Sequence, residues 1–239
     1  FVEQPSETTL RNAKLMPGDI YRGETVGKDQ FSYLGKQRNV KLFDSVSLWD
    51  KVAINNHYDP ESLAPLEALL GLIKSRKGER PQARLSELMD MEAWGRFSVF
   101  ETLASSRHSS NSHNWRIYYD PWRGKFLPLV WDPVGWMWDP YQGRSGVVFD
   151  IVTSKLHELL FLDADFLRAR NSAFREFFHS GKDAHFLELV SDTIELMETE
   201  IEADPFLRPA NSKIVAKEMY KLGSEISSVF DLAKKQWSA

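Results

Sequence analysis

The sequence predicts an α+β fold, in which a short antiparallel hairpin is packed by several helices and the carboxyl-terminal part is helical. Aromatic and aliphatic runs flank a turn at residues 120–124. Apolar residues recur every three or four positions across residues 187–229, as on one face of a helix. Hydrophobic residues make up 42% and charged residues 27%, the balance of a folded protein, and we expect one domain over residues 1–239.

The composition narrows the range of functions that the protein could have. The net charge is −4, which disfavours a general nucleic-acid binder, because such proteins carry a basic field. The absence of cysteine excludes disulfides and thiolate chemistry. No apolar run reaches the roughly 20 residues of a membrane span. The chain begins at Phe1 and not at Met, so we expect a processed form or a fragment.

The amino-terminal third mixes short pieces. We expect a helix over residues 6–13 and a strand over residues 20–22. The run Asp59-Pro60-Glu61 favours a helix start with proline in the first turn. One apolar face then follows, at Leu63, Leu66, Leu69, Leu70 and Ile73.

The middle of the chain contains a helix and a hairpin. Asp90 is a good N-cap for a helix whose apolar face recurs at Trp94, Phe97, Phe100 and Leu103 and that ends at Ser105-Ser106. Residues 115–119 and 125–131 predict two strands. The turn between them runs from Asp120 to Gly124, and Gly124 is free to take positive φ.

The remainder of the chain predicts helices. Pro205 and Pro209 separate the last two, whose faces are amphipathic. The expected helical ranges are 151–162, 164–178, 187–201 and 215–229.

The polar loop over residues 105–114 carries the candidate site. The loop precedes the hairpin, and the hairpin ends at an acid. Kinases use a similar order, in which a loop residue orients the attacking hydroxyl, a later Asn holds a metal, and an Asp beyond the next hairpin holds the metal that bridges the phosphates. Mg²⁺ prefers such oxygen ligands. The candidate residues are His108, Ser110, Asn111, His113, Asn114 and Asp132.

Other interpretations stay open on these residues alone. Most polar loops of this composition are only solvated turns, and an acid such as Asp132 just past a strand is often a cap or turn former. His108 and His113 could be transition-metal ligands, although no third ligand is placed beside them. A cluster of Trp131, Trp136 and Trp138 could be a sugar platform, or core and cleft lining.

The segment HNWRIYYDPWRGKFLPLVWDP resembles the signature of the CotH family of spore-coat, kinase-like proteins. In that family a segment similar to D-N-x-H-N-[YW]-x-x-Y leads through a glycine-containing hairpin to P-W-D. The segments MDMEAWGRFSVFETLA and FLDADFLRARNSAFREFF, and the opening of the chain, resemble further parts of the family. The matching residues are Asn111, His113, Asn114, Trp115, Tyr118, Gly124, Pro128, Trp131 and Asp132.

The resemblance implies an atypical kinase fold that transfers phosphate from ATP to protein Ser/Thr side chains with Mg²⁺. It implies that Asp132 binds metal and that Asn114 is a second metal or phosphate contact. Asn111 and His113 would complete the nucleotide site, and His108 would lie with the catalytic residues. It also implies a protein substrate or a coat or surface partner, and an extracellular, cell-surface or spore-coat location.

Two positions depart from the family pattern. Ser110 stands where the family has its catalytic Asp, and a hydroxyl cannot replace a carboxylate as a base near neutral pH. Val134 stands where a second acid is common, and Asp139 is out of register. The lysine that holds ATP phosphates is expected before Phe1, so we interpret the chain as the larger lobe.

Three functions therefore remain in contention. The first is a kinase-like phosphotransferase. The second is an inactive pseudokinase that acts as a binding or assembly protein of a coat or cell surface. The third is a glycan-associated surface protein that uses the tryptophan cluster.

Overall fold

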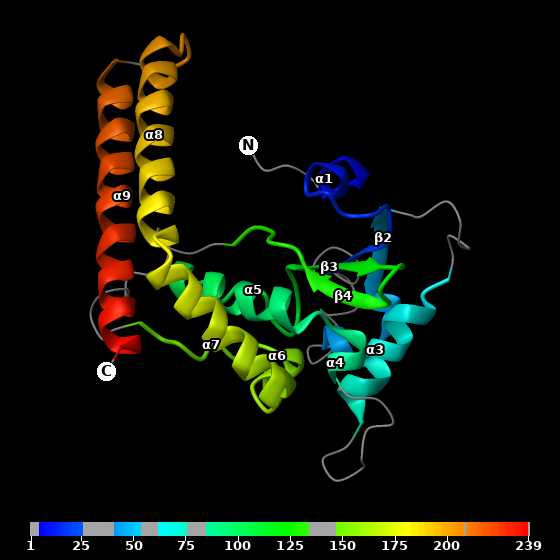
Figure 1. The fold of residues 1–239 in the computed structure, drawn as a ribbon. Helices are drawn as coiled ribbons and strands as arrows, with labels where there is room; N and C mark the ends of the chain where they lie inside the picture. The colour runs from blue at the N-terminus through cyan, green and yellow to red at the C-terminus, as the bar shows by residue number, and fades with distance from the viewer. Residues whose placement is uncertain are drawn as a thin grey trace.

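The computed structural model describes residues 5–25, 41–53, 62–75, 85–133, 147–207 and 209–238. These residues form a mixed α+β structure, which confirms the predicted fold class at that level (Figure 1). The helices are α1 (Glu7–Asn12), α3 (Ala64–Lys74), α4 (Leu85–Leu88), α5 (Met91–Ala104), α6 (Lys155–Leu160), α7 (Ala164–His179), α8 (Lys182–Ala203) and α9 (Pro209–Trp237). The strands are β1 (Ile20–Gly23), β2 (Trp49–Ala53), β3 (Trp115–Asp120) and β4 (Lys125–Pro128), and two 3-10 turns, η1 (Leu42–Asp44) and η2 (Val46–Leu48), precede β2.

The strands form one antiparallel sheet in the order β2-β1-β3-β4. The predicted hairpin is its β3–β4 pair, in which Asp120 lies opposite Lys125 and Gly124 adopts φ +63°. The second strand of the hairpin is shorter than predicted and ends at Pro128. Strand β2 was not predicted, since it pairs with β1 across a long connection.

The predicted elements at the start of the chain are confirmed. Ser6 and Thr9 form a capping box at the start of α1, and residues 20–22 lie in β1. Helix α3 begins at Ala64, with proline in its first turn supplied by Pro65. The predicted start at Asp59–Glu61 lies outside the described residues.

Helix α5 runs through the centre of the molecule. Asp90 caps it, accepting a hydrogen bond from the Ala93 amide at 2.9 Å, and the helix ends where Ser105 adopts φ +53°. Its buried aromatic residues contact the indole of Trp115 at the start of β3. Because Trp115 follows the polar loop directly, this packing fixes where the loop ends.

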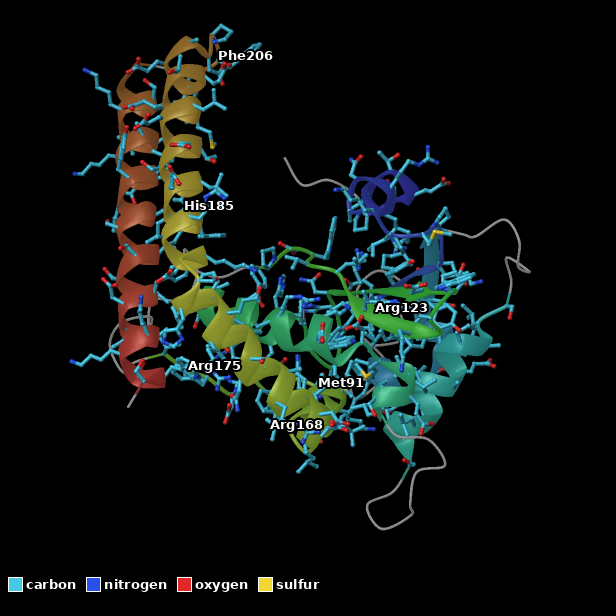
Figure 2. The ribbon with its side chains drawn as sticks, viewed as in Figure 1. Met91, Arg123, Arg168, Arg175, His185 and Phe206 are labelled. Carbon is cyan, nitrogen blue, oxygen red and sulfur yellow. The ribbon has the colours of Figure 1, made fainter. Side chains whose placement is uncertain are left out.

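Helices α5 and α7 lie side by side, and α8 and α9 form a long antiparallel hairpin at the opposite end from the sheet (Figure 1). One hydrophobic core lies between the sheet and α3–α7, and another joins α5 and α7 to the base of the α8–α9 hairpin. Phe206, at the tip of that hairpin, is exposed (Figure 2). The predicted carboxyl-terminal helices are thus confirmed, except that α6 is shorter than the predicted range 151–162, because Ser154 caps it at Lys155 and it ends at Leu160. Among the residues described, no helix has the length and apolar character needed to cross a membrane.

Candidate functional site

The loop over residues 105–114 is held by its main chain, which argues against a merely solvated turn. Five consecutive carbonyl oxygens, from Ser109 to His113, each accept a hydrogen bond. Buried or half-buried carbonyls that are all paired define one backbone conformation.

Three of the donors to these carbonyls, Thr25, Leu42 and Thr153, come from segments distant in sequence. The indole of Trp115 donates to the Ser110 carbonyl at 2.6 Å. The amide of Leu42 donates to the Asn111 carbonyl at 2.7 Å, and Thr25 donates to the Ser112 carbonyl through both its amide and its hydroxyl. The loop is therefore held between the segment that follows β1, η1 and the start of β3.

Asn114 and Asp132 lie together, although 18 positions separate them. The Asn114 side-chain amide donates to the Asp132 carboxylate, with 3.3 Å between Nδ2 and Oδ2. Asn114 is 7% exposed and adopts φ +68°, a conformation that asparagine tolerates better than most residues. Asp132 also has positive φ, at +39°, and its side chain is 49% exposed.

His108 joins the same cluster. Its Nδ1 lies 2.8 Å from the Asp132 carbonyl oxygen and 3.5 Å from the Asp132 carboxylate, and it also contacts the Asn114 amide. The rings of His108 and His113 meet edge to face with centroids 4.8 Å apart. The structure thus brings together four of the predicted site residues: His108 and Asn114 contact Asp132, and His113 packs against His108.

The other two predicted site residues, Asn111 and Ser110, make different contacts. The Asn111 side-chain oxygen accepts from the Lys155 amide at 3.0 Å, so it caps the start of α6. The Ser110 hydroxyl lies 3.3 Å from the Ser112 hydroxyl and accepts from the Ser112 amide. We therefore assign Asn111 a structural role, in which its side chain holds the loop against the start of α6.

Arg116 supplies positive charge beside the cluster. Its guanidinium lies under the Trp131 ring, 4.6 Å from the ring centroid. Burial, and then the nearby Arg22, lower the pKa of Arg116 to about 10, whereas Glu24 and Asp132 counteract part of that shift. Arg116 therefore stays cationic at neutral pH and favours negative charge near Asp132.

Asp120 does not supply a carboxylate at the position of Ser110. Asp120 is buried at the far end of β3 and forms an ion pair with Arg123 at 2.7 Å, beside the hairpin turn (Figure 2). Asp139 lies outside the described residues, as do Val134, Trp136 and Trp138.

The alternatives left open by the sequence can be placed in the same way. Within the described ranges, no three His, Cys, Asp or Glu side chains are grouped so as to hold a metal ion. Trp131, the described member of the tryptophan cluster, has one face over Arg116.

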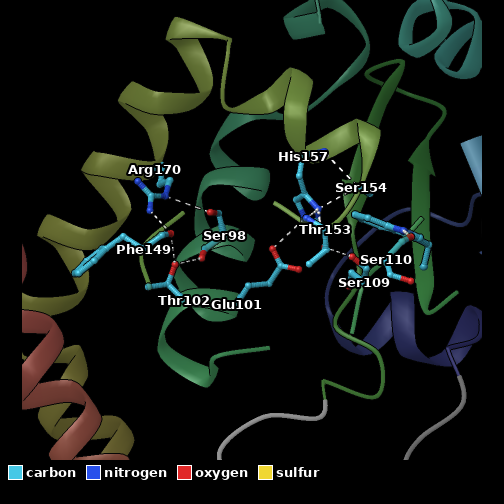
Figure 3. Close-up of polar contacts among 11 residues, drawn as sticks. Ser98, Glu101, Thr102, Ser109, Ser110, Phe149, Thr153, Ser154, His157 and Arg170 are labelled. Atoms are coloured by element: carbon cyan, nitrogen blue, oxygen red, sulfur yellow. Dashed lines mark hydrogen bonds and ion pairs between the residues drawn. The ribbon is translucent and has the colours of Figure 1, made fainter. Parts of the chain in front are cut away.

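A buried polar network beneath the loop was missed by sequence reasoning. Glu101 of α5 and His157 of α6 form a pair with 3.2 Å between Oε2 and Nε2, and both side chains are only 2% exposed (Figure 3). Burial raises the pKa of Glu101, and His157 and Ser109 counteract part of that rise. The sequence signal for this pair was a glutamate within the aromatic stretch of α5. A helical glutamate is usually expected to be exposed, so the sequence alone did not predict that Glu101 is buried.

Comparison with known proteins leaves the family open. A scan against protein-family models finds no match for this chain. A search of curated proteins finds no match either.

Proposed function

We propose that the chain is the larger-lobe part of a CotH-like, kinase-fold domain that binds a Mg²⁺–nucleotide complex at Asn114 and Asp132. The observation that carries the proposal is the contact between these two side chains at 3.3 Å. Two residues from separate elements meet there, in the order loop, hairpin, acid that kinases use.

The donor set is compatible with Mg²⁺. The ion takes oxygen ligands and keeps several waters, so two protein oxygens and substrate phosphates suffice. Asp132 offers a half-exposed carboxylate. The nitrogen and oxygen of an asparagine amide exchange places on half a turn, so Asn114 can present its oxygen to a cation at the same position.

The surrounding residues fit a polyanionic ligand. Arg116 is buried and cationic near Asp132, and the Trp131 ring packs against its guanidinium. His108 holds the Asp132 main chain in its positive-φ conformation. When bound, Mg²⁺ would neutralise phosphate charge at this point, and His108 would hold Asp132 in place.

Phosphate transfer from ATP to protein Ser/Thr side chains is expected to be slow or absent. The position of the family's base is Ser110, whose hydroxyl contacts Ser112 and stays neutral at pH 7. The nearest buried acid, Glu101, faces His157 and is closed to substrate. This favours a pseudokinase that binds nucleotide and acts as a binding or assembly protein of a coat or cell surface.

Titration calorimetry with ATP, in the presence and absence of Mg²⁺, tests the proposal. We expect binding that requires Mg²⁺. If ATP binds equally well after chelation of the metal, or not at all, the nucleotide site is refuted. A glycan-binding surface would then be the alternative to test, with the exposed Trp122 and the half-covered Trp131 as probes.

A further inference from the structure

The segment before α6 holds the candidate loop from below. The Thr153 hydroxyl donates to the Ser109 carbonyl, and two residues later the Lys155 amide donates to the Asn111 side chain. Two successive contacts thus fix residues 109–111 of the loop relative to the start of α6, and Figure 3 shows the first of them, between Thr153 and Ser109.

This segment is itself anchored on the two central helices. The carbonyl of Phe149 accepts from the Thr102 hydroxyl of α5 at 2.9 Å and from the Arg170 guanidinium of α7. The Arg170 Nε also donates to Ser98 at 3.2 Å. The framework of α5 and α7 is therefore connected to the loop through residues 149–153.

The Glu101–His157 pair lies where these connections meet. His157 Nε2 faces the Glu101 carboxylate, and its Nδ1 lies 3.0 Å from the Ser154 hydroxyl and 3.1 Å from the Thr153 hydroxyl. The Ser154 hydroxyl and the Thr153 amide, the latter with 3.4 Å between the two nitrogens, donate to His157 Nδ1. His157 therefore carries its proton on Nε2 and donates it to Glu101, while the Thr153 hydroxyl directs its own proton to the Ser109 carbonyl.

We propose that Glu101, His157 and Thr153 are positioning residues that hold the 105–114 loop in the conformation that brings Asn114 to Asp132. The role in ligand binding rests on the proposed function, whereas the effect on the loop does not. Glu101 orients the His157 ring, the ring faces the Thr153 hydroxyl, and that hydroxyl pins the Ser109 carbonyl.

Two nearly isosteric substitutions at Thr153 separate this role from general stability. Thr153→Val removes the hydroxyl and leaves the Ser109 carbonyl without its donor, and Thr153→Ser retains the hydroxyl. Thr193→Val is the matched control, because the Thr193 hydroxyl bonds only the Leu189 carbonyl of its own exposed helix turn. Hydrogen–deuterium exchange is measured for amides 106–114, for β1 and β3, and for α8–α9.

We expect Thr153→Val to speed exchange of the loop amides about tenfold, as the loss of one buried hydrogen bond predicts. Thr153→Ser should restore slow exchange, and exchange in α8–α9 should not change. His157→Asn and His157→Gln, which each keep one of the two ring-nitrogen contacts, should both speed loop exchange. Loop exchange that is unchanged in Thr153→Val, or that rises equally in the loop and in β1, overturns the proposal.

Mg²⁺–ATP affinity is measured on the same proteins. If the unmodified chain binds Mg²⁺–ATP, Thr153→Val should weaken it and Thr153→Ser should restore it, and equal affinity in both variants contradicts the link to the site. If the unmodified chain does not bind, the proposed function fails. The exchange data then still decide whether the three residues hold the loop.

Discussion

The side chain of Asn114 donates to the carboxylate of Asp132 across 3.3 Å, and both residues adopt positive φ. Left-handed backbone at two non-glycine residues costs conformational energy, of order 1–3 kcal/mol each. Such strain persists only where the surroundings determine it. Here His108, Trp115 and the paired loop carbonyls supply those surroundings.

Replacing Asp132 by Ala tests the proposed metal site. The variant should lose Mg²⁺-dependent ATP binding, by at least about tenfold in affinity, because the charged oxygen ligand is gone. The fold should persist, since the side chain is half exposed.

The matched control for this variant is Asp192→Ala, which removes an equally charged residue from the exposed surface of α8. Calorimetry measures affinity, and thermal unfolding followed by circular dichroism measures the fold. Retained Mg²⁺–ATP affinity in Asp132→Ala would show that the ion is held elsewhere.

Restoring an acid at Ser110 should raise phosphate transfer. A positioned base contributes about 10²–10⁴-fold, so Ser110→Asp is expected to exceed the unmodified chain by up to that factor. Transfer from radiolabelled ATP to a generic protein substrate measures it.

Ser112→Asp adds the same charge two positions away and controls for the charge alone. Robust transfer by the unmodified protein that does not change in Ser110→Asp would mean that the base position is assigned wrongly.

The contact between α5 and α7 predicts opposite effects for two helical glycines. A Cβ on Gly95 would lie 2.7 Å from the Arg170 backbone nitrogen, so Gly95→Ala must push the helices apart and should destabilise by about 1–3 kcal/mol. A Cβ on Gly71 meets no atom within 4 Å, so Gly71→Ala should stabilise α3 by about 0.5–1 kcal/mol.

Urea unfolding of the two glycine variants gives both free energies. Equal effects at the two positions would contradict the close approach of α5 to α7.

The buried Glu101 predicts a pH dependence of stability. A carboxyl whose pKa is raised in the folded state contributes stability that is present below its ordinary value of 4.5 and is lost as pH rises through the raised pKa. Glu101→Gln stays neutral and nearly isosteric. The free energy of unfolding of the unmodified protein, relative to this variant, should therefore fall as the pH rises from about 4 towards neutrality.

Denaturant unfolding at several pH values checks this, with Glu202→Gln on the exposed surface of α8 as the control. A difference between the unmodified protein and Glu101→Gln that stays flat over that range would show that burial does not raise the pKa of Glu101.

Local patterns predicted much of the fold. The α5 cap at Asp90, the turn at Gly124 and the apolar periodicity of α8 and α9 are all encoded within a few residues. Strand β2 could not be found in this way. It is stabilised by partners distant in sequence, such as Arg22, which forms an ion pair with Asp50 at 2.9 Å.

The candidate site was likewise only partly predictable from local sequence patterns. The order of loop, hairpin and acid predicted that Asn114 and Asp132 would share one place, because the hairpin returns the chain to its start. The pairing of Glu101 with His157 spans 56 positions, and no local pattern distinguishes a buried glutamate in a helix from an exposed one. Likewise, nothing near Asn111 indicates that its side chain caps a helix 44 positions later.

Because five carbonyls of the loop are hydrogen-bonded, the backbone conformation of the loop depends little on which side chains it carries. Hydrogen bonds to its main chain hold most of this conformation, so most of its exposed side chains can be replaced without changing the backbone of the loop. A carboxylate at position 110 could therefore be gained or lost by one residue substitution, with the scaffold unchanged. The same property makes the loop a practical starting point for laboratory evolution, in which residues 108, 110 and 113 are randomised together.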